Sequence, residues 1–122
     1  MAGKLKLLVV DDEEALRTIV HHELEAYGFK VDVAEDGEVA LQKLVEKKFD
    51  VVILDIYMPG MDGMEVLRKI REENQKTKVI MLTGVKELKL AKESLALGAN
   101  DFVTKPYEFK NLLACIDRVM KE

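Results

Sequence analysis

The chain has 122 residues, of which 48% are hydrophobic and 34% charged, and its net charge is −4. This length and apolar content suffice for one compact domain, and the acidic balance argues against general binding to nucleic acid or to an anionic membrane. The one cysteine, Cys115, cannot form an internal disulfide, and no apolar run is long enough to cross a bilayer. We therefore expect a cytoplasmic protein.

Apolar runs and helix-like spacings alternate along the whole sequence. The run 7–10 is followed by apolar residues at helical spacing as far as Tyr27, and Gly28 stands where a helix should end. An alternating stretch at 30–35 is followed by a second helical pattern over 40–45. Three more strand-like runs, at 51–54, 79–82 and 101–104, are each followed by a helical pattern, over 66–70, 88–95 and 109–119.

Five strands alternating with five helices predict an α/β fold, a doubly wound parallel five-stranded sheet covered on both faces. The runs 7–10, 51–54 and 79–82 are apolar throughout, which is typical of strands buried on both faces. The more polar stretches at 30–35 and 101–104 are expected at the edges. The strand order 2-1-3-4-5 satisfies these constraints with right-handed crossovers. No linker or repeat interrupts the pattern, so we expect a single domain over residues 1–122.

Polar residues stand at the predicted carboxyl ends of four strands. Asp11 and Asp12 follow the first strand, Asp55 the third, Thr83 the fourth and Lys105 the fifth. In such a sheet these ends lie at one rim, where ligands bind. Three carboxylates against one ammonium leave an excess of negative charge, and oxygen ligands without histidine or cysteine suit a hard cation such as Mg²⁺.

An alternative is that these acids only cap a helix, since Asp12 and Glu13 stand where the first helix is expected to open. Capping accounts for one acid at one helix, and not for acids at two neighbouring strand ends with a lysine opposite. Once a cation neutralises the site, Asp55 can attack phosphorus and form an aspartyl phosphate. Lys105 and Thr83 would then stabilise charge on the phosphoryl oxygens.

Four motifs, taken together at this spacing, resemble the response regulator receiver domain (CheY-like) of bacterial two-component signal transduction. They are VVDDE at 9–13, LDIYMPGMDG at 54–63, MLTG at 81–84 and FVTKPY at 102–107. The resemblance covers essentially the whole chain and implies the flavodoxin-like order of strands. It also implies that the protein is a phosphoprotein and that Asp55 is its phospho-acceptor. Asp55 would take its phosphoryl group from the phosphohistidine of a sensor histidine kinase or a phosphotransfer protein.

The resemblance further implies a ligand set for Mg²⁺, with Mn²⁺ as a substitute. Asp12 and Asp55 would bind the ion directly, Asp11 largely through water, and the backbone carbonyl of Tyr57 would complete the protein ligands. The bond between Lys105 and Pro106 would be cis, which only an X-Pro bond adopts at low cost.

The same resemblance implies a switch. On phosphorylation the Thr83 hydroxyl would move to the phosphoryl group, and Phe102 would turn inward and change the surface formed by the fourth helix, fifth strand and fifth helix. Phe102 has no hydroxyl to bury, so we expect its inward state to be populated before phosphorylation. The alternative is that Phe102 is an ordinary core residue. Kinase docking is expected at the first helix and the segment after the fifth strand, through Leu16, Ile19, His22, Pro106 and Tyr107.

The inner face of the first helix is expected at Ile19, Val20 and Leu24. His21 and His22 are therefore interpreted as solvent-facing residues rather than as phosphorylated histidines.

Two departures from the family pattern carry further expectations. Tyr57 and Val85 stand where small or polar side chains often assist an attacking water, so we expect slow loss of the phosphoryl group. Cys115 and Asp117 occupy places that are basic in the DNA-binding subfamily, so we expect a monomer without direct DNA contact. The sequence stops soon after the fifth helix, which predicts a stand-alone regulator without an effector domain, acting on a protein partner or within a phosphorelay.

Three alternative functions belong to other classes. An enzyme of the haloacid dehalogenase class would need a second aspartate where Tyr57 stands, and a flavodoxin-like cofactor carrier would not place four acids at 11–14 beside a phosphate. A phosphorylation-independent scaffold, or pseudo-receiver, is the remaining alternative. We expect a switch that catalyses only its own phosphorylation and dephosphorylation, and not an enzyme acting on a separate substrate.

Overall fold

The computed structural model describes residues 4–73 and 76–122 as one α/β unit. Its five parallel strands form a sheet of order β2-β1-β3-β4-β5, which confirms the predicted fold and places the two more polar strands at the edges. Each strand lies within one residue of its expected bounds at either end. The strands are β1 Lys6–Val10, β2 Lys30–Ala34, β3 Val51–Asp55, β4 Lys78–Thr83 and β5 Asp101–Thr104.

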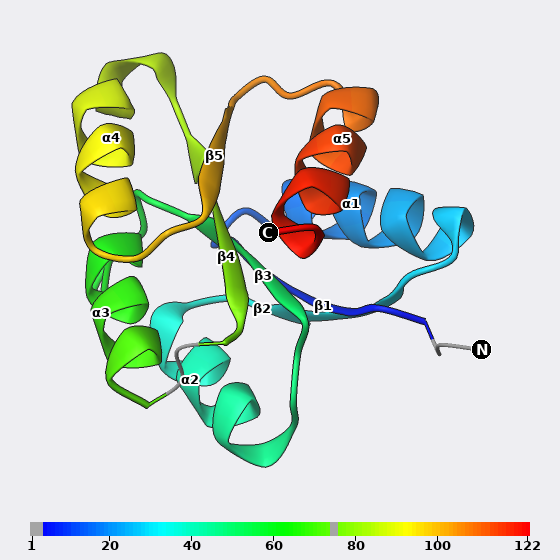
Figure 1. The fold of residues 1–122 in the computed structure, drawn as a ribbon, viewed down its shortest axis with the longest axis horizontal. Coiled ribbons are helices and arrows are strands. Elements are labelled where there is room, and N and C mark those ends of the chain that lie inside the picture. Colours follow the sequence, from blue (N-terminus) through cyan, green and yellow to red (C-terminus); the bar gives the residue numbers. More distant parts are fainter. Residues whose placement is uncertain (1–3, 74–75) are drawn as a thin grey trace.

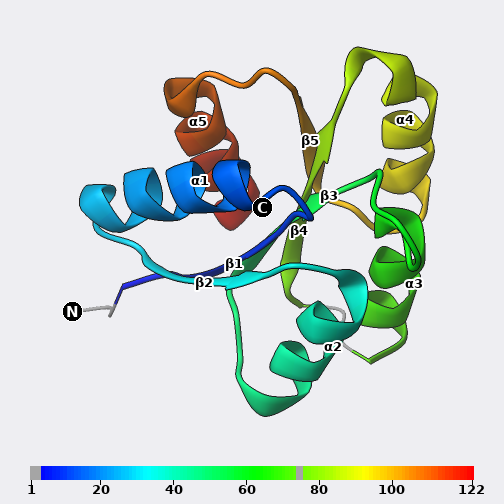
Figure 2. The same ribbon diagram turned by 180° about the vertical axis from the view of Figure 1, so that it is seen from behind.

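Five α-helices connect and cover these strands. Helices α1 and α5 lie on one face of the sheet, and α2, α3 and α4 lie on the other (Figures 1 and 2). No helix among the described residues is long and apolar enough to cross a membrane. The helices are α1 Glu14–Tyr27, α2 Gly37–Glu46, α3 Gly63–Glu73, α4 Leu88–Ala96 and α5 Phe109–Met120, with a short 3₁₀ turn, η1, at Val85–Glu87 before α4.

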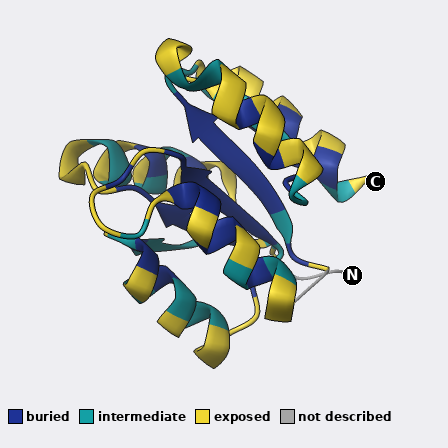
Figure 3. Ribbon diagram, turned by 90° about the vertical axis from the view of Figure 1, so that its left-hand side faces the viewer, coloured by how far each residue is buried: buried dark blue, intermediate teal, exposed yellow. Residues whose placement is uncertain are grey.

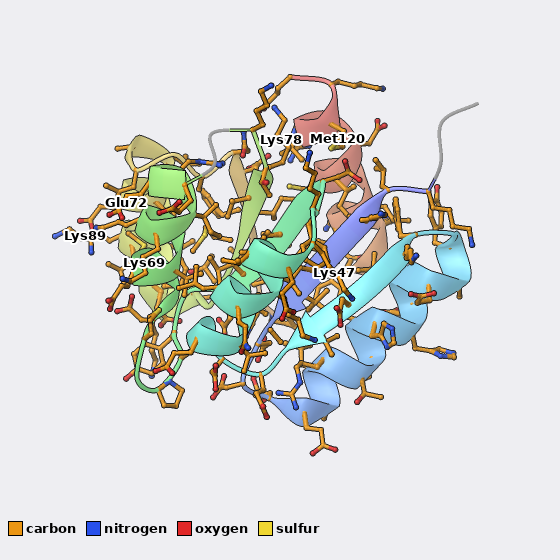
Figure 4. All side chains as sticks on the ribbon, turned by 90° about the horizontal axis from the view of Figure 1, so that it is seen from below. Lys47, Lys69, Glu72, Lys78, Lys89 and Met120 are labelled. Carbon is orange, nitrogen blue, oxygen red and sulfur yellow. The ribbon has the colours of Figure 1, made fainter. Side chains whose placement is uncertain are left out.

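The core consists of two apolar clusters, one on each face of the sheet. Because successive side chains of a strand point to opposite faces, Leu7 and Val9 of β1 join the cluster under α1 and α5, whereas Leu8 and Val10 join the other. The buried strands run between helices that are exposed on their outer sides (Figure 3). Glu72 of α3 and Lys89 of α4 are exposed and lie at the outside of the molecule, away from the sheet (Figure 4).

Helix α1 buries a narrower stripe than the sequence indicated. Val20 and Leu24 are fully buried, but Ile19, which was expected in the core, is 54% exposed. The inner stripe follows the four-residue spacing from the half-buried Leu16 to Val20 and Leu24, so Ile19 lies about 100° away around the helix, towards solvent. Tyr27 is also exposed, and its ring stacks on that of Phe29.

A glycine lets the chain turn sharply after β3. The Gly63 amide donates to the carbonyl of Ile56 at 2.9 Å, and a Cβ at position 63 would overlap the backbone carbonyl oxygen of Asp55. Only glycine allows the start of α3 to approach the end of β3 this closely. The loop between them is thereby folded back beside Asp55.

Arg71 joins the end of α3 to two other segments at the opposite pole of the sheet. Its guanidinium donates to the carbonyl of Gly98 at 2.9 Å, to that of Thr77 at 2.7 Å and to the side-chain oxygen of Asn100 at 3.0 Å. The same oxygen of Asn100 accepts from the amide of Val79 at 2.8 Å. These bonds fix the start of β4 against the turn that leads into β5.

We predict that Arg71→Met lowers the free energy of unfolding by about 2 kcal/mol, because three acceptors at a partly buried site lose their donor. Arg68→Met, on the exposed side of the same helix, is the control and is expected to change that free energy by less than about 0.5 kcal/mol. Urea denaturation of both variants measures the difference, and equal midpoints would contradict the structural role of Arg71.

Candidate functional site

Three carboxylates meet at the carboxyl ends of β1 and β3. Asp11 is fully buried and Asp55 is 5% exposed, whereas Asp12 is open to solvent. One oxygen from each carboxylate can be chosen so that all three lie within 4.8 Å of one another. β1 and β3 are hydrogen-bonded neighbours, so the strand order brings these acids together, as the sequence predicted.

Lys105 reaches this cluster from beyond β5. Its ammonium lies 3.2 Å from Asp11 Oδ2 and 3.2 Å from Asp55 Oδ2, and 3.9 Å from a carboxylate oxygen of Glu13. Burial lowers the pKa of Lys105, but the charges of Asp55 and Asp11 outweigh burial and raise that pKa above its ordinary value. Lys105 is therefore a fixed cation. The peptide bond between Lys105 and Pro106 is cis, as expected.

One ammonium does not neutralise these carboxylates. Burial, and next the charge of Asp11, raises the pKa of Asp55 to about 6, although Lys105 acts in the opposite direction. Ionisation of Asp55 is thus less favourable in the folded protein than in the unfolded chain. A donor set made only of carboxylate oxygens with uncompensated negative charge fits a hard divalent cation such as Mg²⁺.

The capping alternative finds no support in the hydrogen bonds. Helix α1 begins at Glu14 after an N-terminal cap at Glu13, whose side chain makes no capping bond. Asp11 instead accepts the amide of Glu13 at 2.9 Å, in a turn before the helix. Asp36 shows what a capping acid looks like in this chain, because it accepts the amide of Val39 at 2.8 Å at the start of α2.

Thr83 follows Leu82, which pairs with Asp55 in the sheet. Within the described residues, neither the Thr83 nor the Tyr57 side chain hydrogen-bonds Asp55. The Thr83 hydroxyl is buried and donates to the carbonyl of Gly84 at 3.1 Å. The Tyr57 side chain is 74% exposed, and its amide donates to Asp55 Oδ1 at 3.4 Å. The role of the Tyr57 carbonyl as a metal ligand and the movement of the Thr83 hydroxyl on phosphorylation remain predictions.

A pocket of about 280 Å³ opens beside Asp55. The sequence did not indicate one of the residues in its wall, Glu87, which reaches the pocket from the turn η1 after β4. Val85, for which a role beside the phosphoryl group was expected, is 71% exposed and does not line this pocket. The full lining is Asp12, Glu13, Asp55, Tyr57, Gly84, Glu87 and Lys105.

Phe102 lies on β5, opposite Met81 of β4 in the register of the sheet. It is half-buried and packs against the core cluster under α2, α3 and α4. It therefore contributes to the core in this structure, and its rotation on phosphorylation remains a prediction.

The expected docking residues gather, with one exception, around a second hollow of about 490 Å³. Tyr107 fixes one side of it, because its hydroxyl donates to Glu23 at 2.8 Å. Burial and the neighbouring Glu23 raise the pKa of Tyr107. His22 is exposed on α1 but does not line the hollow. The lining is Glu13, Leu16, Ile19, Glu23, Lys105, Pro106, Tyr107 and Phe109, so the hollow shares Glu13 and Lys105 with the pocket at Asp55.

Comparison with known proteins agrees with this geometry. The family model described as the response regulator receiver domain matches residues 7–117. Chemotaxis protein CheY4 of Vibrio cholerae has a similar structure, with a TM-score of 0.90 and 36% identity over 96% of this chain and 99% of that one. A receiver domain protein of Clostridium thermocellum has a TM-score of 0.92 and 32% identity over 96% of this chain and 94% of its own.

Two similar proteins of Bacillus subtilis are named as transcriptional regulators. The alkaline phosphatase synthesis transcriptional regulatory protein PhoP is 37% identical over 95% of this chain and 48% of its own length. The uncharacterized transcriptional regulatory protein YkoG is 37% identical over 95% of this chain and 51% of its own length. The chain thus spans about half the length of the curated relatives it matches.

We predict that Asp55→Asn stabilises the metal-free protein at pH 7 by up to about 3 kcal/mol, because it removes a carboxylate whose pKa rises from 3.8 to about 6 on folding. A raised carboxyl pKa stabilises the fold below the unfolded value and loses that effect as pH rises towards 6. The difference in the free energy of unfolding between variant and wild type should therefore fall below about 1 kcal/mol near pH 4.

Chemical denaturation between pH 4 and pH 7 in the presence of a chelator measures this difference. Glu46→Gln removes an exposed carboxylate at the end of α2 and is the control for a general change in net charge. A difference between Asp55→Asn and wild type that stays constant over this range would contradict the electrostatic account of the site.

Proposed function

Because the chain belongs to the response regulator receiver domain family, we propose that it is a phosphorylation-controlled switch whose phospho-acceptor is Asp55. The family works with histidine kinases and downstream effectors in two-component signalling. The observation that carries the proposal is the contact of one lysine, Lys105, with two buried carboxylates, Asp11 and Asp55, each at 3.2 Å. This arrangement holds a nucleophile and a fixed positive charge side by side.

The proposed reaction transfers a phosphoryl group from a phosphohistidine. An oxygen of Asp55 forms a bond to phosphorus while the bond between phosphorus and the donor imidazole breaks. The imidazole, already protonated at its other nitrogen, keeps the electron pair of that bond and leaves as a neutral ring. The ammonium of Lys105 stabilises the negative charge on the transferred oxygens. The Thr83 hydroxyl exchanges its bond to the Gly84 carbonyl for one to a phosphoryl oxygen.

Mg²⁺, with Mn²⁺ as a substitute, would be held by Asp11, Asp12 and Asp55 together with the Tyr57 carbonyl. When bound, the ion supplies positive charge that compensates the carboxylates and the phosphoryl oxygens. The chain's own residues have the other roles. Asp55 is the nucleophile, and Lys105 orients the phosphoryl group and neutralises charge on its oxygens.

The output of the switch is proposed at α4, β5 and α5. Thr83 ends β4 and Phe102 lies on the neighbouring strand β5, so a movement of the hydroxyl can be transmitted to the aromatic ring. The free energies of the states with Phe102 turned inward and turned outward need to differ by only a few kcal/mol for phosphorylation to shift their populations. The downstream partner is proposed to be a protein, or a further member of a phosphorelay.

The partners upstream and downstream are proposed from the surface. The hollow beside α1, with Ile19 exposed and Pro106 at its rim, is the proposed docking site of the kinase or phosphotransfer protein. The setting is proposed to be the cytoplasm, with the receiver domain monomeric. The relatives named as transcriptional regulators are about twice as long, so the expected lack of direct DNA contact is proposed for this receiver fold alone.

We predict that incubation with acetyl phosphate and Mg²⁺ adds one phosphoryl group to the wild type, as measured by intact-protein mass. The adduct should be absent without Mg²⁺ and absent in Asp55→Asn, because the variant has no carboxylate to attack phosphorus. Asp62→Asn changes an exposed aspartate of the loop after β3 and should leave the adduct unchanged.

If neither acetyl phosphate nor phosphoramidate modifies the wild type at millimolar Mg²⁺, the switch is not phosphorylated and the pseudo-receiver alternative replaces it. An adduct that persists in Asp55→Asn would instead place the phosphoryl group on another residue.

A further inference from the structure

Glu87 is brought to the pocket at Asp55 by a tight turn at the end of β4. Its amide donates to the carbonyl of Gly84 at 3.0 Å, which closes the turn η1. Its carboxylate folds back over Gly84, since a Cβ built at position 84 would lie 2.8 Å from Glu87 Oε1. The missing side chain at Gly84 thus leaves the space that this carboxylate enters.

Most of the charged groups in the wall of this pocket are already engaged. Lys105 contacts Asp55 at 3.2 Å and Glu13 at 3.9 Å. Asp12, whose carboxylate has no hydrogen bond or cation within the described residues, is a proposed ligand of Mg²⁺. Within residues 4–73 and 76–122, the carboxylate of Glu87 accepts no hydrogen bond and pairs with no cation. It is therefore a free acceptor at the wall of the reaction pocket.

We propose that Glu87 is the general base for loss of the phosphoryl group from Asp55, an inference that rests on the function proposed above. A water oxygen forms a bond to phosphorus while the bond between phosphorus and the Asp55 oxygen breaks. Glu87 accepts the proton that the water loses, inorganic phosphate departs, and Asp55 returns as a carboxylate. No further reactant is needed.

The geometry of displacement at phosphorus favours a base at this place. The attacking oxygen and the leaving oxygen lie roughly in line, so the water must approach on the side of phosphorus away from Asp55. Asp55 is buried but lines this pocket, so a water can reach a phosphoryl group on Asp55 through the pocket. Glu87 lines the same pocket, and among the described carboxylates there it is the one that neither pairs with Lys105 nor is a proposed ligand of Mg²⁺.

Glu87→Gln keeps the size and hydrogen-bonding reach of the side chain and removes its basicity. The protein is loaded with acetyl phosphate and Mg²⁺, the donor is removed, and the surviving adduct is followed by intact-protein mass. We expect the adduct of the variant to last about ten times longer than that of the wild type, at the low end of what general-base catalysis contributes. Glu93→Gln, an exposed glutamate on α4, should leave the lifetime unchanged.

A second variant moves the carboxylate without neutralising it. Gly84 has φ −78°, which alanine adopts without strain, but the new Cβ meets the Glu87 carboxylate and displaces it. Gly84→Ala should therefore also lengthen the lifetime, and adding Glu87→Gln to it should have less than about twofold further effect. Such non-additivity is expected when two changes remove one interaction.

The outcomes separate the base from other roles. A lifetime unchanged in Glu87→Gln overturns the proposal, and so does faster loading with an unchanged lifetime, which would make Glu87 only a charge that repels anionic donors. Full additivity of Gly84→Ala and Glu87→Gln overturns it as well. Absence of any adduct on the wild type overturns the proposed function itself, and this inference with it.

Discussion

The contact of Lys105 with Asp11 and Asp55 is the constraint on which the rest of this structure depends. Two carboxylates that are almost completely excluded from water repel each other, and a cation in contact with both offsets this repulsion and the cost of burying them. The lysine comes from beyond β5, at the edge of the sheet, and its length lets the ammonium reach across to the strands that carry the acids. The order of the five strands thus also brings the lysine and the two carboxylates together.

The site retains negative charge even after this contact. Burial and Asp11 raise the pKa of Asp55 to about 6, so its ionisation costs more in the folded protein than in the unfolded chain, and added positive charge would lower that cost. The exposed Asp12 completes a set of oxygens open to an ion from solvent. A cation that lowers the cost of this charge on the nucleophile can link phosphorylation to metal binding. The loop after β3, folded close by Gly63, keeps this arrangement compact.

The sequence predicted the fold well because hydrophobic periodicity is local, and in a parallel sheet it also fixes which ends converge. The meeting of Asp11, Asp55 and Lys105 followed from that alone. The exposure of Ile19 could not be predicted in this way, since it depends on how wide a stripe of α1 packs against the sheet. Glu87 was also missed, because the turn that folds its carboxylate over Gly84 has no periodicity. The signal that could have indicated Glu87 is its position four residues after Thr83, which ends β4.

Calorimetric titration of Mg²⁺ into the metal-free protein at pH 7 tests the central claim most directly, because it measures whether the carboxylates at the strand ends lack a cation. The account predicts binding of one ion, weakened at least about tenfold in Asp12→Asn, whose exposed side chain supports no part of the core. Glu46→Gln should bind as the wild type does. Absence of binding to the wild type, or equal affinity in Asp12→Asn, would contradict the account.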